Sequence, residues 1–204
     1  MAKSTASDTR NQTVKRTVIL KGLSDIMFDR YAGDNKTQLM WNQKIYLIPD
    51  TDILCLPTSN IVSFLSAHNT NSAPKRLRDA RQFKKIANAC LSFVIIQAEN
   101  APSHYIPFLR DGKPVRVGNF GDEMDKQSGL YLDRRVARLD KGIPNPKERP
   151  VLPAPWELRF NLSILPNGEI KEQEILNLFK EGGLAIGLGT FRGVYGKFEV
   201  SSWE

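Results

Sequence analysis

Residues 185–204 read Ala-Ile-Gly-Leu-Gly-Thr-Phe-Arg-Gly-Val-Tyr-Gly-Lys-Phe-Glu-Val-Ser-Ser-Trp-Glu, and no other stretch says as much about the architecture. Four glycines surround one arginine, and from Tyr195 onward the residues alternate as in a β-strand. The glycines are Gly187, Gly189, Gly193 and Gly196. Glycines this dense let a backbone turn tightly and present N–H groups to an anion, and Arg192 and Lys197 add positive charge. We therefore expect a glycine-rich loop that contacts phosphates.

The order of elements around the glycines excludes the common nucleotide-binding loops. A helical pattern from Glu172 to Lys180 ends at Gly182-Gly183, a short apolar strand leads into the glycines, and a second strand follows them. Dinucleotide and P-loop fingerprints instead need a strand, then glycines, then a helix. Neither a Rossmann site nor a Walker site fits this order.

The composition indicates a globular protein with a basic surface. The 204 residues carry 29 Lys and Arg against 22 Asp and Glu, a formal net charge of +7 that is compatible with a nucleic-acid partner. No stretch approaches the roughly 20 apolar residues that span a bilayer, and no signal peptide is visible. Cys55 and Cys90 lie in apolar runs without paired spacing, which predicts buried free thiols. We expect a cytoplasmic protein with no membrane partner, no metal site and no cofactor.

The hydrophobic pattern along the chain predicts one domain over residues 13–204 after a disordered tail at 1–12. Strands are expected at 14–23, 43–48, 53–56, 91–96 and 156–164, with a final strand after the glycines. Helices are expected from Thr58, from Lys75 to about Ala89, and from Glu172. The irregular stretch 100–155 holds eight of the twelve prolines, and we interpret it as a mostly β-hairpin insertion.

Without the 43–56 hairpin and the 100–155 insertion, the order is close to βαββαβ. That order predicts an α+β, ferredoxin-like (RRM-like) antiparallel sheet with helices on one face.

Two segments resemble the repeat-associated mysterious protein (RAMP) superfamily, which supplies CRISPR RNA-binding backbones and CRISPR RNA-processing enzymes. Gly187-Leu-Gly-Thr-Phe-Arg-Gly-Val-Tyr-Gly-Lys-Phe is similar to the superfamily's C-terminal glycine loop. Ile45-Tyr-Leu-Ile-Pro and Leu54-Cys-Leu-Pro-Thr-Ser-Asn-Ile-Val-Ser-Phe-Leu are similar to the stretch of backbone subunits that leads into their first helix. There the family often shows Ser-Ser-x-x-Lys-Gly, whereas this chain has Thr58-Ser59-Asn60-Ile61-Val62-Ser63.

The resemblance implies a CRISPR-type, antiviral-defense role as an RNA-binding subunit. Single-stranded RNA or DNA would be the ligand, and the 100–155 insertion would be the hairpin "thumb" that grips the guide and touches neighbouring copies. The protein would then be a homo-oligomer along the strand or part of a ribonucleoprotein complex.

Candidate binding residues come from three places. On a helix, Arg78, Arg81 and Lys85 would share one face, and exposed aromatic rings in the glycine loop could stack on bases. The candidates are Lys75, Arg78, Arg81 and Lys85 on the helix, Arg134 and Arg138 in the insertion, and Gly187, Gly189, Phe191, Arg192, Gly193, Tyr195 and Lys197 in the loop. Phe191 and Tyr195 are the rings expected to reach a base. Each charged group could equally be a solvated face.

Two alternatives stay open at this stage. A RAMP-type endoribonuclease could use His68 as general base, or a loop aspartate among Asp25, Asp29 and Asp34 with a metal. A phage-encoded mimic could instead dock on or block a CRISPR-type complex. No catalytic residue is assigned, because His68 has no tyrosine or lysine partner within a few residues. We expect no catalysis.

Overall fold

The computed structural model describes residues 12–34, 37–99, 104–117, 129–138 and 144–204. The predicted tail at 1–12 lies almost wholly outside this range. Ten strands are described: β1 (Val14–Gly22), β2 (Ile26–Met27), β3 (Cys55–Pro57), β4 (Val94–Ala98), β5 (Tyr105–Arg110), β6 (Lys113–Pro114), β7 (Tyr131–Arg138), β8 (Pro144–Leu152), β9 (Glu157–Ile164) and β10 (Phe198–Trp203). The helices are α1 (Thr58–Ser66), α2 (Ala73–Leu77), α3 (Phe83–Phe93), α4 (Glu172–Ala185) and the 3-10 helix η2 (Trp41–Lys44).

The central sheet has the order β10-β1-β9-β4, with all neighbours antiparallel. Numbered along the βαββαβ core, this is the 4-1-3-2 order of a ferredoxin-like fold, so the predicted fold is confirmed. The register of β1 against β9 runs from Val14 opposite Ile164 to Lys21 opposite Glu157. At the other end of β9, its neighbour is β5 instead of β4, and β3 and β6 each pair with β5.

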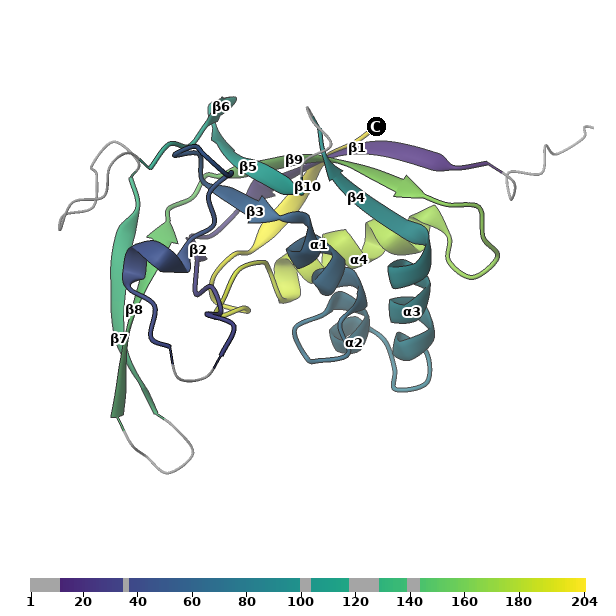
Figure 1. Ribbon diagram of the computed structural model, residues 1–204. Coiled ribbons are helices and arrows are strands. Elements are labelled where there is room, and N and C mark those ends of the chain that lie inside the picture. The colour runs from purple at the N-terminus through teal and green to yellow at the C-terminus, as the bar shows by residue number, and fades with distance from the viewer. Residues whose placement is uncertain (1–11, 35–36, 100–103, 118–128, 139–143) are drawn as a thin grey trace, which may run out of the picture.

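All four α-helices lie on one face of this sheet (Figure 1). The strand β9 alternates as predicted, because Leu158, Phe160, Leu162 and Ile164 are buried between partly exposed residues. The core between sheet and helices is aromatic: Phe179 of α4 packs against Phe64 of α1 and Phe160 of β9. Burying such rings is worth about 1.5–3 kcal/mol each, which fixes the helices on the sheet.

A second, three-stranded sheet has the order β2-β8-β7. The hairpin of β7 and β8 extends away from the sheet, on the same side as the helices (Figure 1). The insertion therefore contains the expected hairpin, but its first part differs, since β5 and β6 belong to the main sheet. Both cysteines are buried and free as predicted, and burial raises the pKa of each thiol to about 12. No helix of the described residues is long and apolar enough to cross a membrane.

The predicted strand at 43–48 is wrong. Residues Trp41–Lys44 form the 3-10 helix η2 instead, and only an isolated bridge joins Leu47 to Leu54. Local bonds explain the turn, because Gln43 donates its amide to the carbonyl of Met40 and accepts the Met40 amide on its side chain. The strand expected from Leu91 also begins later, at Val94, since α3 continues to Phe93.

The predicted continuous helix from Lys75 to Ala89 is broken into α2 and α3. Arg78 is extended, with φ −118° and ψ 158°, and the Asp79 carboxylate accepts the amides of Arg81 and Gln82. Arg78 then turns back to α4, where its guanidinium donates to Glu174 (2.8 Å) and Glu181 (3.0 Å). Arg78, Arg81 and Lys85 therefore share no helical face.

The helix α4 runs through Gly182-Gly183 to Ala185 instead of ending there, so no strand precedes the glycine loop. These two glycines let other elements approach the helix closely. A Cβ on Gly182 would lie 2.6 Å from the Phe64 ring, and one on Gly183 would lie 2.7 Å from the ring of Phe198. Packing thus explains the pair better than helix termination does.

Gly183→Ala should destabilise the fold by about 1–3 kcal/mol, because the added methyl overlaps Phe198. The sign is diagnostic, since in an unpacked helix the same change stabilises by about 1 kcal/mol. Urea unfolding measures the effect, with Gly168→Ala as control because a Cβ there meets nothing within 4 Å. A stabilised Gly183→Ala would contradict the packing.

Arg78→Ala should lower the free energy of unfolding by about 1–3 kcal/mol, because it leaves two carboxylates on α4 without their partner. Arg81→Ala, which removes an exposed arginine from the same turn, should change it by less than about 0.5 kcal/mol. Equal effects of the two substitutions on the urea midpoint would refute the structural role of Arg78.

Candidate functional site

The glycine loop, residues 187–197, is held in place by its own amides. Gly187 and Gly193 donate to the carbonyls of Gly182 and Ile186, and Gly196 donates to the carbonyl of Asp25 (2.7 Å). These three amides are therefore already bonded within the protein, which leaves Gly189 as the loop glycine whose amide has no described acceptor. Contact of the loop residues with nucleic acid stays a prediction.

Gly196 shows why the loop needs glycine. Its φ is +73°, and a Cβ there would overlap the carbonyl of Leu188. Across the loop, the Leu188 amide donates to the Gly196 carbonyl (2.9 Å). The two ends of the loop thus touch backbone to backbone. Only a residue without a side chain permits this approach.

Arg192 bridges the loop to the turn between α1 and α2. Its Nε donates to the carbonyl of Gly189 (3.1 Å), and its Nη1 donates to the carbonyl of Asn71. Burial lowers the pKa of the guanidinium from its usual value. The side chain therefore orders the loop, with its remaining N–H groups as the donors left for a ligand.

The two loop rings have different environments. Tyr195 is buried, so the expectation that it reaches a base is wrong, and its hydroxyl lies 3.2 Å from Asp133 on β7. Phe191 keeps 49% of its surface exposed. Arg135 of β7 lies over both rings, with its guanidinium carbon 5.4 Å from the centre of Phe191 and 5.3 Å from that of Tyr195.

The hairpin is fastened to the loop at its base. Met27, Val151 and Tyr195 form a small second core, and Met27 bridges to Thr190 of the loop. The Tyr131 hydroxyl on β7 donates to Asp25 (2.7 Å), and burial together with that carboxylate raises the pKa of Tyr131. The loop and the hairpin therefore form one assembled surface.

Three neighbouring cavities share lining residues, and we call them together the palm groove. The first, of about 410 Å³, and the second, of about 140 Å³, share Gly189 and Thr190; the second and the third, of about 540 Å³, share Asp29. The palm groove is lined by α1, the glycine loop, the 29–46 segment and β8. Its lining includes Arg30, Tyr31, Trp41, Tyr46, Asn60, Ser63, Lys147, Phe191 and Arg192.

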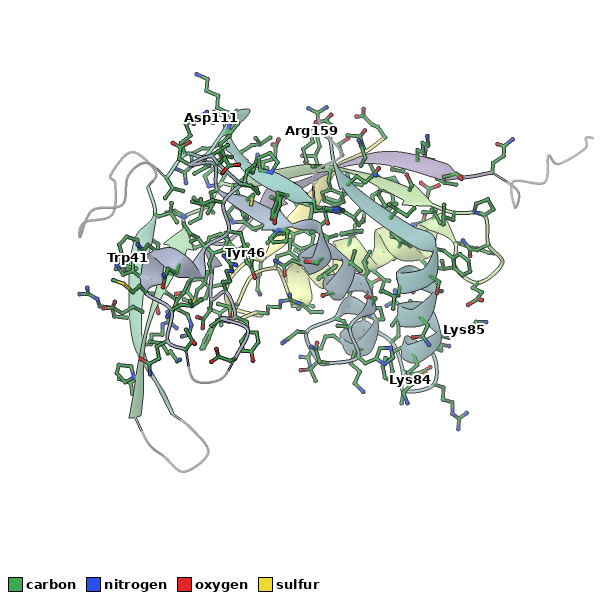
Figure 2. The ribbon with its side chains drawn as sticks, in the orientation of Figure 1. Trp41, Tyr46, Lys84, Lys85, Asp111 and Arg159 are labelled. Carbon is green, nitrogen blue, oxygen red and sulfur yellow. The ribbon has the colours of Figure 1, made fainter. Side chains whose placement is uncertain are left out.

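Most of these residues were missed by sequence reasoning. The 29–46 segment was interpreted as a polar loop and a strand, although it holds Tyr31, Trp41 and Tyr46 among charged residues. Arg30 lies over the ring of Tyr46, at 5.5 Å from its centre, and Tyr31 is 64% exposed. Figure 2 shows Trp41 and Tyr46 on the hairpin side of the molecule. An exposed aromatic cluster with adjacent arginine was the available signal.

The predicted basic helix does not line the palm groove. Five cations of α2, α3 and the turn between them have no carboxylate partner among the described residues, and we call them the basic corner: Lys75, Arg76, Arg81, Lys84 and Lys85. Lys75 lies over the ring of Phe83 at 4.1 Å. Figure 2 shows Lys84 and Lys85 at the end of α3 far from the hairpin. Arg78 is taken by α4 and is no longer a candidate for binding.

One of the two candidate arginines in the insertion has a described partner. Arg134 pairs across the hairpin with Glu148 at 2.8 Å, while the side chain of Arg138 lies outside the described residues. Lys197 bonds through its backbone to Ser24, and its side chain has no described partner.

The residues considered for catalysis have other partners. His68 lies 3.1 Å from the carboxamide oxygen of Asn88, and Asp34 accepts the amide and hydroxyl of Thr37. Asp29 pairs with Arg149 at 2.7 Å, and Asp25 bonds Tyr131. Across the described residues, no group of three His, Cys, Asp or Glu side chains is arranged to hold a metal.

Comparison with known proteins identifies the fold alone. No protein-family model and no curated protein sequence matches the chain. A chain in the "Cryo-EM structure of the Type III-B Cmr-beta bound to cognate target RNA" is similar in structure, with a TM-score of 0.57 and 13% sequence identity. The match covers 96% of this chain and 62% of that one, so this protein spans less than two thirds of its structural neighbour. The fold is thus also that of a component of an RNA-bound assembly.

Proposed function

We propose that the protein binds single-stranded RNA in the palm groove, as a subunit of a CRISPR-type ribonucleoprotein in the cytoplasm. The observation that carries the proposal is the groove itself: three cavities, linked by shared lining residues, between the glycine loop, the first helix and the hairpin. The similarity to a chain from an RNA-bound structure supports RNA over DNA.

The groove lining favours a single strand over a duplex. Unstacked bases can stack on exposed aromatic side chains, and Tyr31 and Phe191 supply exposed rings at the two ends of the groove. Three carboxylates line the groove, and the central one is screened, because Asp29 lies 2.7 Å from Arg149 and 3.8 Å from Lys44. Glu148 pairs with Arg134 at 2.8 Å, and Asp34 accepts hydrogen bonds from Thr37. A phosphate backbone therefore meets little uncompensated negative charge at the centre of the groove.

The cations available to phosphates lie inside and outside the groove. Arg30 and Lys147 line it and have no carboxylate partner among the described residues. The basic corner and Lys197 would add contacts to the strand beyond the groove. In this proposal the glycine residues position Phe191 and Arg192 and do not bind phosphates through bonded amides.

Replacing Arg30 and Lys147 together with alanine should weaken RNA binding and lower the log–log salt slope by about 1.4, or about 0.7 for each lost phosphate contact. Fluorescence anisotropy with a labelled single strand measures this, and a duplex of the same length should bind more weakly. The charge-matched variant Arg81→Ala/Lys85→Ala should have the smaller effect, because these residues lie at the basic corner. If the salt slope changed only in the Arg81→Ala/Lys85→Ala variant, the phosphate contacts would lie at the basic corner, and the proposal that RNA binds in the groove would be wrong.

The hairpin also supports a proposal that copies assemble along the strand. It extends from the body (Figure 1), and its strand β7 carries Val136, which is 61% exposed. A neighbouring copy would cover this arm.

Val136→Asp should abolish stepwise assembly on long RNA while leaving binding to a short RNA unchanged, because the charge cannot be buried against a neighbour. Sedimentation velocity at saturating protein measures the number of copies on each RNA. Wild-type protein that stays monomeric on the long strand would rule out assembly, and the binding proposal would remain.

A further inference from the structure

Phe191 has an uncommon backbone conformation and an exposed side chain. Its φ is +55°, in the left-handed region that favours glycine, and the residue is 49% exposed. Strained backbone positions of this kind persist where the surrounding structure enforces them, often at ligand sites. The conformation of Phe191 is therefore consistent with a ligand site beside it.

The ring is fixed from one side by two neighbours. Arg135 lies over it, and Tyr195 meets it edge-on, with 6.3 Å between ring centres and an angle of 75°. Tyr195 is itself buried and bonded to Asp133, so its position does not vary. The exposed part of Phe191 is therefore a pre-positioned flat surface.

Phe191 lines a cavity of about 410 Å³ at the end of the palm groove. That volume lies within the range of small-ligand sites and suits one base with its sugar better than a longer segment. The opposite wall is the end of α1 and the turn after it, with Ser63, Asn69 and Asn71. Arg192 closes one side, where its bonds to Gly189 and Asn71 hold the turn against the loop.

The polar groups of this wall are available. The Ser63 hydroxyl and the Asn71 carboxamide have no side-chain partner in the described part of the chain, and Asn69 uses only its oxygen, which accepts the Asn71 amide at 3.0 Å. A carboxamide presents a donor and an acceptor side by side, the pattern that distinguishes one base edge from another. The pocket thus joins a stacking surface to groups that can recognise a base edge.

We propose that this pocket, the base pocket, takes one unpaired nucleobase of the strand in the groove and makes binding base-selective. The base stacks on Phe191, and its edge bonds to Ser63, Asn69 and Asn71. The inference rests on the proposed function, because the strand must first lie in the groove.

The test compares labelled homopolymeric RNAs of adenylate, cytidylate and uridylate of equal length. Wild-type protein should prefer one of them. Phe191→Ala should weaken the preferred RNA about tenfold, the effect expected for one lost stacked base. Ser63→Ala/Asn71→Ala should bring the three affinities together while leaving the salt slope unchanged, since phosphate contacts remain.

Controls separate the ring from the loop backbone. Phe191→Asn keeps a residue that tolerates left-handed φ, so it should lose affinity as Phe191→Ala does even though the loop stays folded. Val194→Ala removes an apolar side chain that is 60% exposed in the same loop but outside the pocket, and it should bind as wild type does.

The outcomes distinguish the two proposals. RNA bound equally in all three sequences, with no loss in Phe191→Ala and Phe191→Asn, would overturn the base pocket and leave the groove intact. A base preference that survives Ser63→Ala/Asn71→Ala would also overturn it. No binding of any RNA by the wild type would overturn the proposed function, and the base pocket with it.

Discussion

Asp25 is bonded on three sides, and the functional surface depends on those bonds. Its carbonyl accepts the Gly196 amide, and its two carboxylate oxygens accept the Tyr131 hydroxyl and the Ala154 amide. This single residue, which follows β1 by three positions, thereby joins the sheet to the glycine loop, to β7 of the hairpin and to the segment between β8 and β9. Losing the carboxylate would leave the Tyr131 hydroxyl and the Ala154 amide without this partner, and the cost is about 1–3 kcal/mol for a donor that is buried, such as the partly buried Ala154 amide.

Ser24 completes the same junction. Its carbonyl accepts the Trp156 indole N–H (2.8 Å), and its hydroxyl accepts the Lys197 amide (3.0 Å). Trp156 is fully buried at the start of β9, so the junction is anchored in the core of the sheet. The glycine loop is consequently a rigid part of the palm, and the left-handed φ of Phe191 is enforced from both ends of the loop. A loop held so firmly positions side chains well and leaves few of its own amides for a ligand.

The ferredoxin-like core could be predicted from sequence because its strands obey local periodicity. β1 and β9 alternate cleanly, and their lengths match along the shared register. The errors lie where tertiary contacts outweigh local pattern. Gly182-Gly183 has the sequence of a helix end, yet Phe64 and Phe198 need the space that a Cβ would fill. Likewise, nothing local in residues 75–89 reveals that Arg78 leaves the helix for two glutamates nearly a hundred residues away.

The palm groove could not be predicted, because four separate segments build it and no single one has its chemistry. Its charge also differs from what a net +7 suggests. One group of cations lies at the basic corner, whereas the groove lining mixes aromatic rings, carboxamides and carboxylates with the cations Arg30 and Lys147. Phosphate contacts attract any sequence, while base contacts discriminate between sequences. In this proposal Arg30 and Lys147, on the 29–46 segment and β8, attract phosphates, while the pocket between α1 and the glycine loop selects the base. On the proposed function, the salt-dependent part of RNA affinity and its base-dependent part therefore reside on different elements of the same fold.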